Sequence, residues 1–229
     1  MDVMDATRRA FIGGAICALT CPPRAHAADA VVEDWRELAP GTTGVPAGWR
    51  PYETPMGRPA YDFAIANDGG RRALRLKSAN EHSTIAKEVK VRLAATPVLK
   101  WDWRVVTQPA GADLRERSTS DASGHIFVLW PRFPAIVRSR LIGYVWDPAL
   151  AVGTIVRSRK TATVTFIVAR AGAERLGQWV SDERNVADDY RRVYGEEPDD
   201  PKAIALSIDT NDTRSSAEAL FGRIAFVGR

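Results

Sequence analysis

Short segments in which apolar and polar residues alternate constrain the fold of this chain more than any other feature of its sequence. Two of them, residues 61–66 and 73–77, flank the turn sequence Asn67-Asp68-Gly69-Gly70. Alternation with a period of two is typical of strands that bury one face, and Asn and Gly tolerate the positive φ of a tight hairpin turn. Further strands are predicted at residues 84–91, 98–106, 125–130, 141–146, 161–169, 203–208 and 223–227.

About nine strands separated by polar or Gly/Pro links are typical of an antiparallel β-sandwich or jelly roll. No strand-then-helix alternation appears, which argues against a doubly wound parallel sheet. One substantial helix is predicted near the C-terminal third, at residues 183–194, with Ser181 or Asp182 as its cap and Gly195 at its end. Its apolar stripe consists of Val186, Tyr190, Val193 and Tyr194. The sequence therefore predicts an all-β fold with one helix.

The first 27 residues have the pattern of an export signal. Thr7-Arg8-Arg9 opens a short apolar run at residues 11–20, and Ala25-His26-Ala27 resembles a cleavage site. The paired arginines favour the twin-arginine route, and the run is too short for a membrane span, which needs about 20 apolar residues. Residues 1–27 are therefore predicted to be removed, leaving a single periplasmic or secreted domain at residues 28–229.

The charge and cysteine content of the chain argue against disulfides, metal clusters and nucleic-acid binding. Both cysteines, Cys17 and Cys21, lie in the predicted signal, so we expect neither disulfides nor thiolate-bound clusters. The whole chain has a net charge of +4, too small a surplus to indicate nucleic-acid binding. No transmembrane segment is expected after residue 27, no nucleotide, flavin or haem motif is present, and the oligomeric state is left open.

Several motifs, in order along the chain, resemble an uncharacterised bacterial secreted family, domain of unknown function 3047. They are the "P-x-L-x-W-x-W" strand at residues 97–103 and the segments 144–146, 183–190, 203–213 and 217–226. The resemblance implies a β-sandwich similar in shape to carbohydrate-binding modules and brings no established activity. Where the family tends to carry paired aspartates followed by an arginine, this chain has Asp121 and then His125, which leaves a charge-based role there open.

The candidate ligand site is built on the strand at residues 98–106. Trp101 and Trp103 share one of its faces, predicted to pack in the core, while Asp102 and Arg104 share the other. A charged pair is costly to bury unless it is paired, so these two side chains should face solvent, a cleft or each other. With Tyr144 beside them, and seven tryptophans in the chain, they suit a saccharide, including one whose carboxylate an arginine can hold.

Other polar groups are weaker candidates. Arg184 is expected to pair with Asp188 on a solvated helix face or to brace the helix on the sheet. His125 follows Asp121 and Ser123, so a catalytic triad can be drawn, although a polar histidine at the start of a strand is the simpler interpretation. Asp209, Asn211 and Asp212 follow a strand and offer oxygen ligands for calcium, or else form Asx turns and cap a helix at residues 215–220.

These observations favour a non-catalytic saccharide- or ligand-binding protein of the cell envelope. Two alternatives stay open: a glycan-acting hydrolase or lyase, because sandwich folds also host enzymes, and a structural assembly factor. A groove lined by Asp102, Arg104, His125 and Tyr144 would favour an enzyme or a buried ligand. An exposed tryptophan platform would favour a glycan-binding surface.

Overall fold

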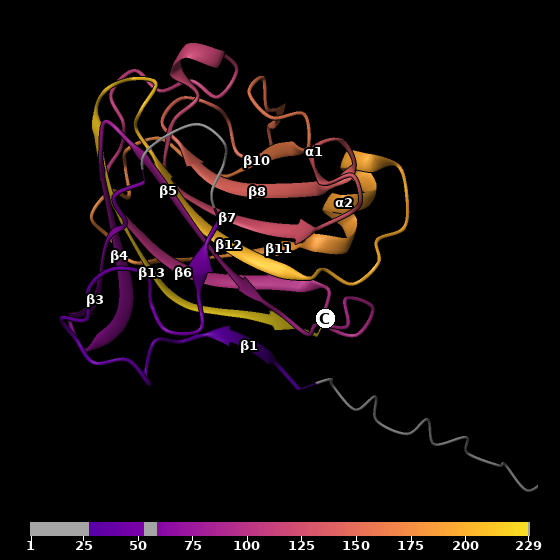
Figure 1. Ribbon diagram of the computed structural model, residues 1–229, viewed down its shortest axis with the longest axis horizontal. Coiled ribbons are helices and arrows are strands. Elements are labelled where there is room, and N and C mark those ends of the chain that lie inside the picture. Colours follow the sequence, from indigo (N-terminus) through magenta and orange to yellow (C-terminus); the bar gives the residue numbers. More distant parts are fainter. Residues whose placement is uncertain (1–27, 53–58, 229) are drawn as a thin grey trace, which may run out of the picture.

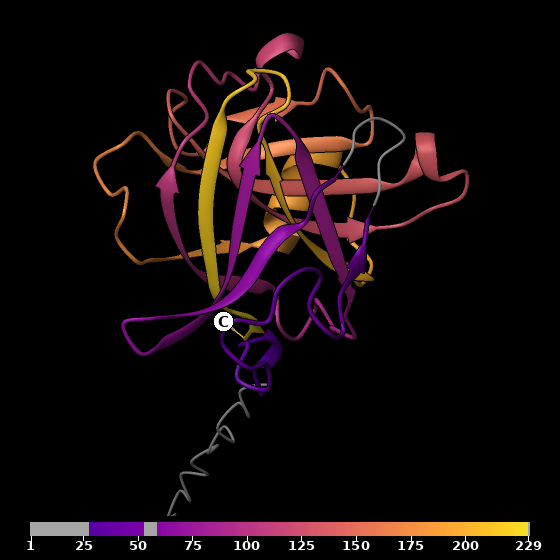
Figure 2. The ribbon, with the colours of Figure 1, turned by 60° about the vertical axis from the view of Figure 1, so that its left-hand side comes forward.

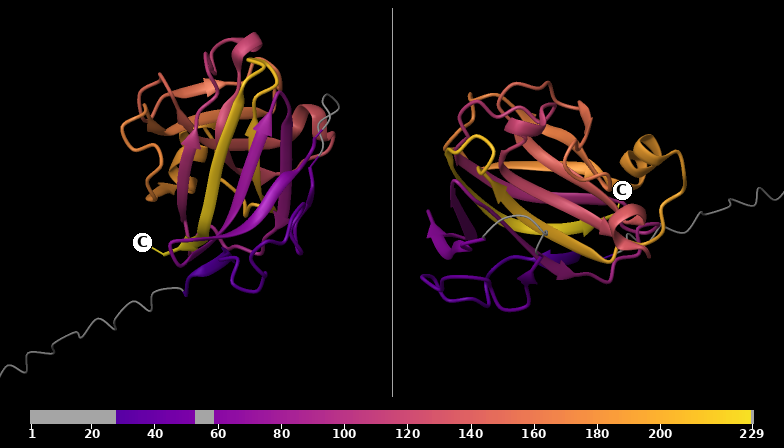
Figure 3. Two further views of the ribbon diagram at one scale, coloured as in Figure 1. Left: turned by 90° about the vertical axis from the view of Figure 1, so that its left-hand side faces the viewer. Right: turned by 45° about the horizontal axis from the view of Figure 1, so that its top comes forward.

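The computed structural model describes residues 28–52 and 59–228, which form two β-sheets packed face to face (Figure 1). The predicted signal, residues 1–27, lies outside the described residues. The six-stranded sheet contains β1 (Ala30–Glu33), β3 (Asp62–Asp68), β4 (Arg71–Ala79), β6 (Val98–Thr107), β11 (Val180–Asn185) and β13 (Ser216–Val227). Its strands follow the order β11-β6-β13-β4-β3, with β1 paired to β13. In the left view of Figure 3, yellow β13 runs through the middle of this sheet.

The seven-stranded sheet has the order β2-β5-β12-β7-β8-β10-β9. Its strands are β2 (Arg50–Pro51), β5 (His82–Glu88), β7 (Ala122–Trp130), β8 (Arg140–Asp147), β9 (Ile155–Arg157), β10 (Val164–Ala171) and β12 (Ala203–Asp209). Two short helical segments, η1 (Arg117–Thr119) and α1 (Ala135–Arg138), and one longer helix, α2 (Val186–Tyr194), complete the described elements. The predicted sandwich with one substantial helix is confirmed. One strand pair departs from the antiparallel pattern, because β8 and β10 pair in parallel.

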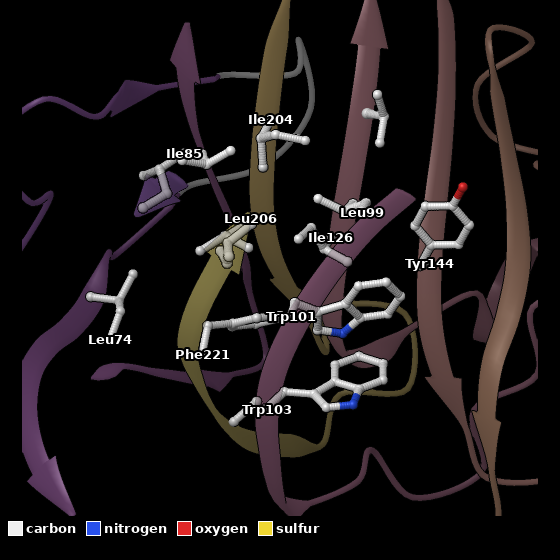
Figure 4. Packing of buried hydrophobic residues seen from close by; sticks show 14 of the residues in the cluster. Leu74, Ile85, Leu99, Trp101, Trp103, Ile126, Tyr144, Ile204, Leu206 and Phe221 are labelled. Carbon is white, nitrogen blue, oxygen red and sulfur yellow. The ribbon is translucent and has the colours of Figure 1, made fainter. Parts of the chain in front are cut away.

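The main core lies between the two sheets and is rich in aromatic rings. Trp101 of β6 stacks on Tyr144 of β8, with ring centroids 5.4 Å apart (Figure 4). The ring centroids of Trp103 and Trp146 are 5.5 Å apart. Six of the seven tryptophans are buried, so most of them pack the core, as predicted for the β6 pair. They therefore provide no exposed platform.

A second apolar cluster covers the outer face of the seven-stranded sheet. Phe127 and Leu129 of β7 and Phe166 of β10 point away from the main core and pack against Leu114 and Leu150 from the long connections. This cluster has no counterpart in the sequence prediction, because alternation along a strand does not reveal that both of its faces are covered. One face of the sandwich is thus closed by loops.

Helix α2 begins later than predicted. The side chain of Asn185, not Ser181 or Asp182, caps it by accepting a hydrogen bond of 3.0 Å from the backbone N–H of Asp188. Residues 180–185 form β11 because they pair with β6, with Glu183 opposite Lys100. The predicted stripe does face the core, and Gly195 ends the helix with φ of 72°.

Two further local predictions need correction or extension. Residues 216–220 form the first part of β13, and not a capped helix, because they pair with β4. Strands β1, β2, β9 and β11 were not predicted; they are short or lie at sheet edges, where alternation is hard to recognise. The hairpin around residues 67–70 is confirmed, with Gly69 and Gly70 at φ of 60° and 84°. No helix among the described residues is long and apolar enough to cross a membrane.

Candidate functional site

Asp102 and Arg104 lie on the outer face of the six-stranded sheet. Because side chains alternate along β6, burial of Trp101 and Trp103 turns these two polar residues away from the core. Their side chains are 27% and 30% exposed. The predicted division of this strand into an apolar and a charged face is therefore confirmed, and the charged face is partly open to solvent.

A network of charged and aromatic groups connects these two residues. The Arg104 Nη1 donates a hydrogen bond of 2.7 Å to Oδ2 of Asp68, and the Trp179 indole N–H donates one of 2.6 Å to the same oxygen. The Arg71 guanidinium lies 4.7 Å from the centroid of the Trp179 ring, and its Nη1 is 3.3 Å from Oδ2 of Asp102. The hydrogen bonds from Arg104 and Trp179 lower the pKa of Asp68, so it is a fixed anion at neutral pH.

A cleft of about 330 Å³, called here the β6 cleft, adjoins this network. It is lined by Lys100, Trp101, Asp102, Ser181, Asp182, Glu183 and Arg223. The Ser181 hydroxyl donates to Oδ1 of Asp102, and Lys100 forms an ion pair of 2.8 Å with Glu183 across the strands β6 and β11. The cleft therefore presents hydroxyl, ammonium, guanidinium and carboxylate groups within a small space.

Gly222 shapes the place where the cleft meets the network. A Cβ atom there would come within 3.1 Å of Cβ of Asp102 and 3.4 Å of the Trp179 ring. The missing side chain lets the indole lie close to the sheet, in a bulge of β13 that interrupts pairing between Phe221 and Ile224. Trp179 is the one tryptophan that is not buried, and its ring lies next to Gly222, beside Asp102, which lines the β6 cleft.

Tyr144 and Arg184 lie elsewhere, at the junction of the core with α2. The Tyr144 side chain is fully buried, and its hydroxyl donates a hydrogen bond of 3.0 Å to Asp189. Burial, with the Asp189 charge, raises the pKa of Tyr144 well above its ordinary value. Arg184 pairs with Asp189 and not with Asp188, which pairs with Arg191. Arg184 thus braces the helix, one of its two predicted roles.

His125 lies on the outer face of the other sheet. Its ring stacks 5.3 Å from Phe127 and 5.5 Å from Phe166, and burial lowers its pKa to about 4. The Asp121 carboxylate accepts hydrogen bonds from Thr213, and within the described residues neither Ser123 Oγ nor His125 Nδ1 has a hydrogen-bond partner. The hydrogen bonds of a catalytic triad are therefore not formed.

Two of the three predicted calcium ligands, Asp209 and Asp212, lie beside an amine. The Lys160 ammonium forms an ion pair with Asp212 and lies 3.8 Å from Oδ2 of Asp209, while Asn211 is exposed. Burial raises the pKa of Asp209 to about 8. Across residues 28–52 and 59–228, no three or more His, Cys, Asp or Glu side chains are grouped to hold a metal ion. A calcium ion would have to displace Lys160, and calcium binding stays a prediction.

The predicted site residues therefore separate into distinct places. Asp102 and Arg104 belong to one outer face, Tyr144 and Arg184 to the core and the α2 junction, and His125 to the opposite outer face. The groove that would have joined them is not formed. The sequence did not identify Asp68, Arg71 and Ser181 as parts of a site. Asp68 and Arg71 were recognisable only as residues at a hairpin turn, and Ser181 lies in β11, a strand that was not predicted. The hydrogen bond of Trp179 to Asp68 was missed as well.

The architecture is that of a mostly β two-sheet sandwich resembling carbohydrate-binding modules. The chain belongs to the family described as protein of unknown function DUF3047, which matches residues 47–225. No curated protein matches the chain in sequence.

Solved structures with a similar fold share little sequence with the chain. A family 11 carbohydrate-binding module from Clostridium thermocellum is 9% identical, with 90% of this chain and 97% of that one covered and a TM-score of 0.46. A family 30 module of a C. thermocellum cellulase is 9% identical, with 89% and 99% covered and a TM-score of 0.46. A xyloglucanase domain of a type three effector from Sinorhizobium fredii is 9% identical, with 82% and 98% covered and a TM-score of 0.43.

Proposed function

We propose that this chain is an exported, non-catalytic saccharide-binding protein whose site is the β6 cleft together with Trp179. The observation that carries the proposal is the position of Trp179. Six tryptophans are buried, whereas this one lies half-buried over Gly222 and beside Asp102, which itself lines the polar cleft.

The chemistry of the cleft suits a polyhydroxylated ligand. Binding sites for small molecules combine an aromatic or apolar surface with a few fixed polar groups that orient the ligand. Asp102 and Glu183 offer acceptors for sugar hydroxyls, Lys100 and Arg223 offer donors, and the indole of Trp179 offers a flat apolar surface. Arg223 forms an ion pair of 3.2 Å with Asp29, which a saccharide carboxylate would replace as its partner.

The polar groups at this site are held in place before any ligand arrives. Arg104 and Trp179 both donate to Asp68, and Arg71 stacks on the indole while contacting Asp102. Groups that are already ordered lose less conformational entropy on binding, which favours affinity. Arg104 is therefore a positioning residue that fixes the indole through Asp68, not the carboxylate-binding residue of the sequence-based hypothesis.

The first test is a screen of the chain on an array of neutral and acidic oligosaccharides, followed by an assay for turnover of every glycan that binds. We expect binding without cleavage. Absence of binding to any glycan, with the protein folded, would overturn the saccharide proposal and favour the envelope structural role. Cleavage or elimination products would overturn the non-catalytic part and favour the glycan-acting enzyme.

A further inference from the structure

The most exposed large apolar side chains gather at one point, the turn between β7 and β8. Phe133, Ile136 and Val137 are 89%, 84% and 70% exposed, within five consecutive residues that overlap the start of the short helix α1. In Figure 2 the salmon-coloured hairpin of β7 and β8 projects to the side of the sandwich and carries this turn at its end. We call these three residues the apolar tip.

Elsewhere in the described residues, large exposed apolar side chains occur singly, as at Val31, Tyr52 and Val152. Single exposed apolar residues are ordinary, whereas a cluster of them on a protruding element marks an interaction surface. Within residues 28–52 and 59–228 nothing covers these three side chains, so their exposed apolar surface is free to contact a partner.

Cationic side chains lie at the base of the tip. A cleft of about 400 Å³, called here the arginine cleft, is lined by Arg132, Val137, Arg138, Ser139, Arg140, Ala162, Thr163, Tyr194 and Glu196. Val137 belongs both to the tip and to the cleft, so the apolar and the cationic surfaces are continuous. The arrangement places apolar side chains at the end of the hairpin and guanidinium groups next to them.

Two of the three arginines are held by neighbours and one is free. Arg140 forms a two-point ion pair of 2.8 and 2.9 Å with Glu196 and lies 4.7 Å from the Tyr194 ring centroid. Arg132 is 2.8 Å from Asp199. The Arg138 guanidinium, on α1 itself, has no hydrogen-bond or ion-pair partner within the part of the chain that the structure describes. One cation next to the tip is therefore available to an anionic partner.

We propose that the apolar tip docks the protein on a bilayer surface that contains anionic phospholipid. Side chains of this kind enter the boundary between headgroups and acyl chains, while neighbouring basic residues bind the lipid phosphates. Phe133, Ile136 and Val137 supply the inserted surface. Arg138 supplies the contact to phosphate, for which a guanidinium group has a matching geometry.

The size and shape of the tip favour a bilayer over a second protein. A stable protein interface buries at least about 1,000 Å² with close shape complementarity, which three side chains on a narrow projecting turn do not provide. A bilayer needs no complementary shape and accepts a small apolar wedge. The proposal is independent of the saccharide site, which lies on the six-stranded sheet.

The test is cosedimentation of the full chain with phosphatidylcholine vesicles that contain about a quarter phosphatidylglycerol, and with pure phosphatidylcholine vesicles. We expect binding to the anionic vesicles only, weakened by salt. Compared with the wild type, the variant Phe133→Ser/Ile136→Ser should bind at least about tenfold more weakly. Arg138→Ala should bind about fivefold more weakly. Val152→Ser, which removes an apolar side chain that is 61% exposed at another place, should bind like the wild type.

Every variant carries the same residues 1–27, so the comparison isolates the tip. Thermal unfolding should be unchanged in all variants, because the substituted side chains are exposed. Equal vesicle binding by the tip variants and the wild type would overturn the proposal. Failure of the wild type to bind vesicles would overturn it too. If the wild type is then a dimer that the tip substitutions dissociate, the tip is a contact to a second copy of the chain. Binding abolished by soluble glycerol phosphate but unchanged in the tip variants would reduce the site to a phosphate pocket and also contradict it.

Discussion

The Tyr144 hydroxyl donates a hydrogen bond of 3.0 Å to Oδ2 of Asp189, which fastens the seven-stranded sheet to helix α2. Arg184, at the edge of the six-stranded sheet, donates to both oxygens of the same carboxylate. One buried anion therefore joins the helix to both layers of the sandwich. Arg184 and Tyr144, two residues that the sequence suggested for ligand binding, stabilise the fold instead.

Replacing Tyr144 by Phe removes one hydrogen bond to a buried charged group and leaves the Arg184 ion pair in place. We expect the free energy of unfolding to fall by about 1 to 3 kcal/mol, the range for hydrogen bonds to charged groups. Chemical denaturation measures the change. Tyr52→Phe is the matched control, because Tyr52 is 37% exposed and its loss of a hydroxyl should cost little. Equal unfolding free energies for the two variants would contradict the structural role of Tyr144.

Alternation along the strands predicted which faces the residues occupy but not which faces meet. Trp101 and Asp102 were assigned to opposite faces of one strand, and the structure agrees. His125 and Tyr144 were both candidates for the ligand site, yet β7 and β8 pair with His125 opposite Val145, so Tyr144 points to the other face of the sheet. Strand pairing and sheet order are long-range properties that the local pattern does not contain.

The start of α2 and the position of Trp179 show the same limit. Residues 181–185 carry good capping and helix-forming groups, but pairing with β6 draws them into a strand, because tertiary contacts override local propensity. Trp179 meets Asp68 across 111 residues of sequence. No motif around either residue signals that contact.

His125 predicts a pH dependence of stability. Its folded pKa is about 4, whereas an unfolded histidine has a pKa of about 6.5, so the unfolded state binds more protons between these values. The stabilisation is complete above pH 6.5 and is lost as the pH falls toward 4. Over that window the wild type should lose about 3 kcal/mol of unfolding free energy relative to His125→Gln. Denaturation curves at several pH values test this, and parallel profiles for the two proteins would show that His125 is not the group responsible.

Export through the twin-arginine route is a separate prediction from residues 1–27. Replacing Arg8 and Arg9 by lysine keeps the charge but removes the paired guanidinium groups, so we expect precursor to accumulate in the cytoplasm. Fractionation and immunoblotting measure the distribution, with Arg36→Lys as a matched control. An unchanged periplasmic yield would indicate the general secretory route.

The saccharide proposal is tested most directly by titration calorimetry. The glycan that binds most tightly on the array is titrated into the wild type and into four variants. Trp179→Ala and Asp102→Ala remove the indole and a carboxylate of the β6 cleft, and Gly222→Ala crowds both. Arg157→Ala removes an exposed arginine on β9 of the other sheet and is the control. We predict affinities about tenfold lower or more for the first three, and an unchanged affinity for Arg157→Ala. Equal affinities for all four folded variants would place the saccharide elsewhere and contradict the account.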